Sequence, residues 1–130
     1  MYYASKKQRQ EKAAHLLVGK VGEETAVRYL KGIGYEIRAT NVRIERDEID
    51  IVAFDPVDQV IAFVEVKTRT KFEQDDFRPE MTAGWAKRRK LKRSARRWVA
   101  NHHYDGGYRI DLVCVFEGRV QHHFKELSWE

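Results

Sequence analysis

Two charged side chains interrupt an apolar stretch of the chain in a pattern that suits phosphate chemistry. The segment IAFVEVKTRT begins as an apolar run at Ile61, and Glu65 and Lys67 then follow two residues apart. If this segment is a β-strand, both side chains lie on the same face. A carboxylate at the end of a core strand needs a partner, and a carboxylate beside an ammonium group suits a site that holds a divalent cation and a phosphate.

The segment EIDIVAF supplies a second carboxylate, Asp50. Antiparallel pairing about the turn DPVDQ places Asp50 opposite Glu65, and Glu48 opposite Lys67. Directly opposed residues have Cβ atoms about 4.5–5.5 Å apart, so the two carboxylates would repel each other. Mg²⁺ or Mn²⁺ between them is the simplest stabilising arrangement, and a plain Glu48–Lys67 ion pair is the structural alternative.

A third carboxylate, Glu23, falls on the apolar stripe of a predicted helix. It precedes Ala26, Val27 and Leu30 by three, four and seven positions. A carboxylate on a core-facing stripe needs a partner, and a metal ion that Glu23 binds directly or lies beside is one such partner. The structural alternative is that Glu23 stabilises the start of the helix through the helix dipole.

A strongly basic segment, KRRKLKRSARR, occupies Lys87–Arg97 and holds no acidic residue. An apolar stripe through Leu91, Ala95 and Trp98 would hold it to a sheet, which leaves a surface of one charge sign. Such a surface suits phosphate contacts with a nucleic acid, whereas a solvated helix face is the structural alternative. The residues expected to contact phosphate are Lys87, Arg88, Arg89, Lys90, Lys92, Arg93, Arg96 and Arg97, together with Arg69 near the carboxylates.

The elements that must position these residues follow from periodicity and turn signals. We expect helices at 19–32 and 80–101, and strands at 35–43, 48–54, 60–68, 108–116 and 119–124. The order is α-β-β-β-α-β-β. Short turns join the first three strands antiparallel, and the strand after the second helix can return parallel. The sequence therefore predicts an α/β fold with a single mixed sheet flanked by helices.

The whole chain fits one domain. It has 130 residues and a net charge of +5, and we expect a basic, partly helical and loosely held arm at 1–18 before a domain at 19–130. The single cysteine, Cys114, excludes an intrachain disulfide and is expected to be buried among apolar neighbours. Because no apolar run approaches the roughly 20 residues of a membrane span and no signal sequence is recognisable, we predict a cytoplasmic protein with no membrane partner.

These motifs resemble those of a known family. The stretches GEETAVRYLKGIGYEI, NVR, EID, FVEVKTR and RID, spread between Gly19 and Cys114, are similar to the YraN-like family of uncharacterised bacterial proteins. That family resembles archaeal Holliday junction resolvases and the wider PD-(D/E)XK nucleases. The resemblance implies a restriction-endonuclease-like fold.

The resemblance also implies roles for individual residues. Asp50 and Glu65 would be metal ligands, and the backbone carbonyl of Val66 would be a further ligand. Lys67 would be the catalytic lysine, and Glu23 would match the helix carboxylate of the resolvases. One departure is Asp47, which stands where the family usually has glycine before EID, so the geometry of this loop is expected to differ.

The sequence thus favours a Mg²⁺- or Mn²⁺-dependent endonuclease that hydrolyses phosphodiester bonds in DNA. Branched or flapped DNA is the substrate that the resemblance implies, and a homodimer is possible because a junction presents two symmetric cuts. Two alternatives stay open. One is a non-catalytic nucleic-acid-binding module, and the other is a protein-interaction subunit whose basic helix meets an acidic partner.

Overall fold

The computed structural model describes residues 5–69 and 85–125, with side chains from residue 89 in the second range. Two helices and five strands follow the predicted order. They are α1 (Lys6–Gly32), β1 (Glu36–Ile44), β2 (Asp47–Asp55), β3 (Val60–Arg69), α3 (Trp85–Asn101), β4 (Gly107–Phe116) and β5 (Arg119–Phe124). The predicted α/β class is confirmed, and the expected start of the second helix at residue 80 lies outside the described residues.

The five strands form one mixed sheet in the order β1-β2-β3-β4-β5. Neighbouring strands are antiparallel except β3 and β4, which are parallel because α3 carries the chain back to the other end of the sheet. The predicted register of the β2–β3 hairpin is also confirmed, since Val52 pairs with Phe63 and Phe54 with Ile61. This arrangement is consistent with a restriction-endonuclease-like fold.

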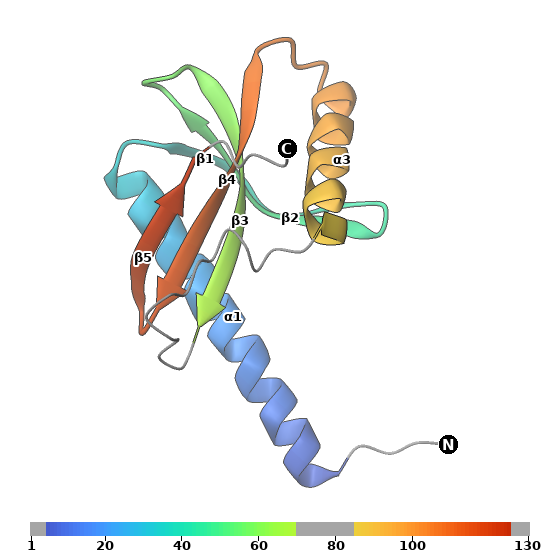
Figure 1. Ribbon diagram of the computed structural model, residues 1–130, viewed down its shortest axis with the longest axis vertical. Helices are drawn as coiled ribbons and strands as arrows, with labels where there is room; N and C mark the ends of the chain where they lie inside the picture. The colour runs from blue at the N-terminus through green and yellow to red at the C-terminus, as the bar shows by residue number, and fades with distance from the viewer. Residues whose placement is uncertain (1–4, 70–84, 126–130) are drawn as a thin grey trace.

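The helices cover opposite faces of the sheet (Figure 1). Ala26 and Leu30 of α1 pack on a cluster that includes Val64, whereas Ala95 and Trp98 of α3 pack on a cluster around Phe63. Adjacent residues of β3 therefore point to different layers, as strand periodicity requires. Cys114 is buried, as predicted.

The first helix is longer than the sequence analysis predicted. It starts at Lys6 rather than at residue 19, and it therefore runs through the expected boundary between arm and domain. A capping box fixes its start, because the Ser5 hydroxyl accepts from the backbone N–H of Gln8 and the Gln8 side chain accepts from that of Ser5. The first turns extend away from the sheet (Figure 1) and are exposed, so no apolar stripe marks them in the sequence.

Strand β2 changes the face that it presents at Asp50. Ile49 packs in the cluster under α3 and Ile51 in the cluster under α1, although residues two apart on a regular strand share a face. The strand is therefore twisted at Asp50, and its early part reaches towards α3 (Figure 1). This places the polar residues around Asp50 between the two layers.

Ion pairs fasten the tip of the β1–β2 hairpin to α3. The guanidinium of Arg93 donates to Asp47 Oδ2 at 3.0 Å, and the Ser94 hydroxyl donates to the same oxygen at 3.2 Å. One turn later, Arg97 lies 3.0 Å from a Glu45 carboxylate oxygen. Asp47 thus has a structural role in joining hairpin and helix.

A buried charge network lies on the α1 face, away from that hairpin tip. Arg109 bridges two buried carboxylates, with Asp55 Oδ2 and Asp111 Oδ1 each at 2.8 Å. Asp111 also lies 2.8 Å from His123 Nε2 and accepts from the Tyr35 hydroxyl. Because each buried charge has a partner, the network is compatible with the core that surrounds it.

No helix among residues 5–69 and 85–125 has the length and apolar character that a membrane crossing requires.

Candidate metal centre

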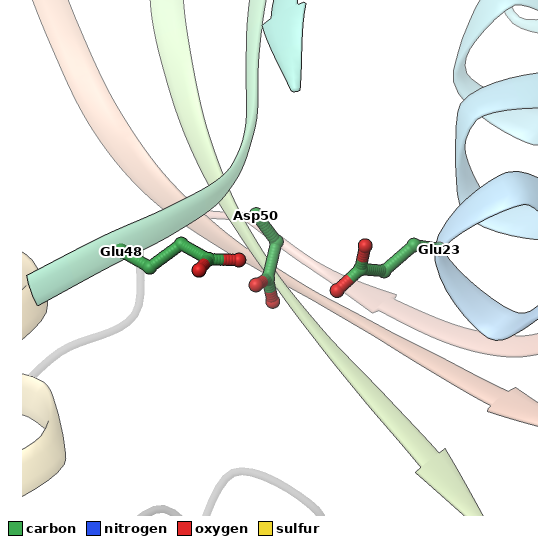
Figure 2. Close-up of side chains that lie close together, drawn as sticks. All are labelled: Glu23, Glu48 and Asp50. Atoms are coloured by element: carbon green, nitrogen blue, oxygen red, sulfur yellow. The ribbon is translucent and has the colours of Figure 1, made fainter. Parts of the chain in front are cut away.

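Three carboxylates from two elements converge at the twist of β2. Glu23 reaches in from α1, while Glu48 and Asp50 project from β2 and meet it, with Asp50 in the middle (Figure 2). One carboxylate oxygen from each residue lies within 4.8 Å of the others. Hard oxygen ligands at this spacing are what Mg²⁺ and Mn²⁺ bind.

Strand β3 adds the fourth carboxylate that the sequence analysis predicted. The backbone N–H of Val66 donates to Asp50 Oδ2 at 2.8 Å, which fixes the Asp50 side chain against β3. The negative charge of the Glu65 carboxylate raises the pKa of Asp50, so these two carboxyl groups lie close enough to interact. Asp50, Glu65 and Glu23 are therefore brought together, whereas a ligand role for the Val66 carbonyl stays a prediction. Lys67 is half-buried two residues beyond Glu65.

The electrostatics of this cluster fit a site for a divalent cation. Burial raises the pKa of Asp50 to about 7, and the charges of Glu65 and Glu23 act in the same direction. The pKa of Glu23 is also raised, first by burial and then by Glu48 and Glu65. Carboxylates this close are costly to ionise without a counter-charge, and a bound divalent cation would supply one.

Glu48 is the acidic residue whose place in the cluster the sequence analysis missed. It was considered only as a partner of Lys67, but its carboxylate lies with those of Glu23 and Asp50. The signal was present in the sequence, because Glu48 and Asp50 are two residues apart on one strand and therefore share a side. What the sequence did not reveal is that the twist at Asp50 turns this side towards α1.

Asn41 is a second residue that sequence reasoning passed over, although it was noted within NVR. With its amide oriented to donate, the side-chain nitrogen lies 2.9 Å from Glu23 Oε2 and 3.1 Å from Glu48 Oε1. Its φ of 51° is in the left-handed region, which Asn tolerates better than most residues. One neutral amide thus cross-links two carboxylates of the cluster.

Replacing Asn41 by Asp is expected to destabilise the metal-free protein, because two donors are exchanged for another carboxylate. The thermal midpoint in EDTA should fall by several degrees, a loss of about 1–2 kcal/mol, and Mn²⁺ should restore most of it. Gln59→Glu is the matched control, since it makes the same amide-to-acid change at a remote turn position with φ 54°. Equal effects of the two substitutions, with no recovery in Mn²⁺, would contradict this role of Asn41.

Two pockets of about 430 Å³ each flank the acidic cluster. The first lies between α1 and the β1–β2 hairpin, and the second lies between that hairpin and α3. Each has basic residues beside the acids. The first is lined by Lys20, Arg28, Glu23, Glu24, Val27, Thr40, Asn41, Asp50 and Ile51, and the second by Arg46, Lys90, Asp47, Glu48, Glu65, Leu91 and Ser94.

The predicted phosphate-binding residues of α3 fall into distinct groups. Arg93 and Arg97 are engaged by the hairpin acids, so their first role is structural. Lys90 lines the second pocket, and the remaining basic side chains that are described, Arg89, Lys92 and Arg96, point to solvent. Arg69 on β3 is half-buried, and the side chains of Lys87 and Arg88 lie outside the described residues.

The raised pKa of Asp50 gives the metal-free protein an unusual pH dependence. Because the folded-state pKa of about 7 lies above the ordinary 3.8, this group stabilises the fold below about pH 4 and loses that contribution as pH rises through 7. Urea unfolding in EDTA at pH 5, 6, 7 and 8 should therefore show a decline on the order of a few kcal/mol. In Asp50→Asn the decline should be much smaller; an equal slope in both proteins would show that Asp50 is not the titrating group.

Comparison with known proteins shows which family and which bacterial proteins this chain is similar to. The model of the family described as "Uncharacterised protein family UPF0102" matches residues 22–115. A "UPF0102 protein" of Oleidesulfovibrio alaskensis is 41% identical over 78% of this chain, and the match spans 49% of that protein's own length. One of Mycobacterium ulcerans is 36% identical over 78% of this chain and 83% of its own, and one of Thermodesulfovibrio yellowstonii is 33% identical over 84% and 94%.

Proposed function

Given that the chain belongs to the uncharacterised protein family UPF0102, we propose that it is a metal-dependent endonuclease that hydrolyses phosphodiester bonds in DNA. The observation that carries this proposal is the convergence of Glu23, Glu48 and Asp50 at the twist of β2, beside Glu65 and Lys67 on β3. An acidic cluster in which the pKa values of Glu23 and Asp50 are raised, next to a lysine and between two pockets that each carry two basic residues, suits a phosphate substrate better than a neutral one.

Asp50, Glu65, Glu48 and Glu23 are the residues that would hold Mg²⁺ or Mn²⁺. When bound, such a cation lowers the pKa of a water molecule and offsets negative charge on the phosphate. The chain has three means of keeping the ligands in place. The Val66 N–H holds Asp50, and the Asn41 amide holds Glu23 and Glu48. The β2–β3 pairing, which ends at Ile51 and Val64, brings the next residues, Asp50 and Glu65, near each other.

The role proposed for Lys67 is to position the attacking water and to stabilise the charge that builds up on the phosphate. Its ammonium group belongs to the same strand end as Glu65, and a fixed positive charge at that place is worth most in a partly buried site. Lys67→Met keeps the length of the side chain and removes its charge, so we expect it to lower the turnover number more than the affinity for substrate.

The basic residues on both sides of the cluster are proposed to hold the sugar-phosphate backbone. Lys20 and Arg28 lie on the α1 side, and Arg46 and Lys90 lie on the α3 side. A strand that crosses the cluster from one pocket to the other would meet positive charge before and after the scissile phosphate. These contacts are to phosphate and carry no sequence information, which supports recognition of DNA shape, with branched or flapped DNA as the proposed substrate.

A panel of labelled substrates tests this proposal: single-stranded DNA, duplex, flap, fork, four-way junction and an RNA strand. Each is incubated with Mg²⁺, Mn²⁺ or EDTA, beside Glu65→Gln purified in the same way. We expect cleavage that requires the metal, is strongest on a branched or flapped substrate, and is absent in the variant. Binding of these substrates without cleavage in any metal would instead indicate a non-catalytic nucleic-acid-binding module.

A further inference from the structure

We infer that the face of α1 that carries Glu23 continues towards the N-terminus as a phosphate-binding track for a duplex arm of the substrate. This inference rests on the proposed function and extends it, because it assigns a role to the part of α1 that projects beyond the sheet (Figure 1). The track consists of Lys20, Lys12 and Arg9.

Helix periodicity places these residues on the same face as Glu23. Lys20, Lys12 and Arg9 precede Glu23 by three, eleven and fourteen positions, which are close to whole multiples of 3.6. At about 100° per residue, all three lie within about 60° of the direction of Glu23. All three are exposed, and Lys20 lines the same pocket as Glu23. The basic row therefore begins at the proposed centre and leads away from it.

No acidic side chain lies on this face of α1 between Lys6 and Lys20. Glu11 is the one acidic residue between Lys6 and Lys20, and it lies about 120° round the helix from Glu23. No residue of the first three turns of α1 belongs to either of the described core clusters. The start of the helix is nevertheless defined, because the capping box fixes it at Ser5. A defined, projecting helix with a one-sign face suits a ligand of opposite charge that lies along it.

A second copy of this chain is the competing occupant, because Leu16 and Leu17 are 68% and 62% exposed. Leu16 lies on the track itself, between Lys20 and Lys12. Pairing two copies through this face would bring Lys12 and Arg9 of one copy against the basic residues of α1 in the other copy, and like charges in contact are unfavourable. A phosphate backbone meets the same side chains with charge complementarity, so it is the occupant that we favour.

The length of the projecting part of α1 determines how many base pairs of the duplex arm it can contact. From Glu23 to Arg9 the helix rises about 21 Å, and at about 3.4 Å per base pair this corresponds to about six base pairs. Affinity should therefore increase with arm length up to about six base pairs and then level off. An arm of four base pairs should not reach Lys12, which lies about 16 Å from Glu23 along the helix axis.

Lys12→Ala tests the track, with Lys7→Ala as its matched control. Lys7 has the same charge on the same helix, but it lies about 160° round from Glu23. Fluorescence anisotropy in EDTA, where cleavage cannot interfere, measures binding of flap substrates with hairpin-closed arms of four or twelve base pairs. With the long arm, Lys12→Ala should weaken binding about tenfold at 0.1 M salt and lower the salt slope by about one, while Lys7→Ala changes neither.

The outcomes separate this inference from the proposed function. Equal effects of Lys12→Ala and Lys7→Ala on a substrate that the parent protein binds and cleaves would overturn the track alone. Unchanged DNA binding, with a dimer in sedimentation that Leu16→Lys dissolves, would assign the face to a second copy and overturn it as well. A parent protein that binds no nucleic acid of any shape would overturn both.

Discussion

Replacing Asp50 by Asn is expected to lower the rate of cleavage by about 10³-fold or more while the fold is kept. The substitution removes the charge at the centre of the cluster but not the side-chain oxygen that accepts from the Val66 N–H. Loss of a group that stabilises charge in the transition state commonly costs about 10²–10³-fold, and this residue would also hold the cation. The rate constant for single-turnover cleavage of a flap substrate measures the effect.

The same substitution is expected to strengthen the metal-free protein. Asp50 is difficult to ionise beside Glu65 and Glu23, so a neutral side chain relieves repulsion that the parent protein bears at neutral pH and above. Asp50→Asn should therefore have a higher thermal midpoint than the parent in EDTA at pH 8. Asp105→Asn, an exposed change of the same kind, is the control and should alter neither rate nor midpoint. Loss of activity together with loss of stability would contradict a functional reason for the cluster.

The second large effect is expected at Arg109. Arg109→Met keeps much of the side-chain volume and leaves Asp55 and Asp111 buried without their cation. Although burial raises the pKa of Asp55, hydrogen bonds from Arg109 and from the backbone N–H groups of Val57 and Asp58 hold it below the ordinary value. Asp55 is therefore ionised at neutral pH, and removing the guanidinium that pairs with it should lower the free energy of unfolding by about 3–5 kcal/mol.

Urea unfolding at pH 7 measures this loss, with Arg119→Met, an exposed change on β5, as the control. The double variant Arg109→Met/Asp111→Asn should recover part of the stability, because one of the two stranded charges is then removed. A loss below about 1 kcal/mol in Arg109→Met would mean that the carboxylates are satisfied without the guanidinium.

The sequence was informative about the fold because its local signals agree with one another. Alternating and apolar runs bounded by turns predicted all five strands, and the turn around Pro56 predicted the register of β2 and β3. The start of α1 was missed because residues 6–12 are all polar and residues 6–17 are exposed, so no buried stripe marks this part of the helix. There the helix is specified by the cap at Ser5 and by intrinsic propensity, which are weaker signals than burial.

The parts of the candidate site that depend on strand register and helix periodicity could be predicted from the sequence. The parts that depend on the local twist of the backbone could not. Register alone placed Asp50 beside Glu65, and helix periodicity turned Glu23 inward. The addition of Glu48 and Asn41 depends on the twist of β2 and on a left-handed residue in β1, neither of which has a periodic signature. The engagement of Arg93 and Arg97 by the hairpin was equally invisible, because it joins segments about fifty residues apart.

The most direct test of the central idea, that the carboxylates form a divalent-cation site, is calorimetric titration of Mn²⁺ into the parent protein and into Asp50→Asn. The parent should bind Mn²⁺ at pH 7 and release protons as it does so, because Asp50, with its pKa near 7, must ionise to bind the cation. The observed enthalpy should therefore change with the ionisation enthalpy of the buffer, and Asp50→Asn should bind at least about tenfold more weakly with little proton release. Isotherms that are the same for both proteins, in every buffer, would contradict the account.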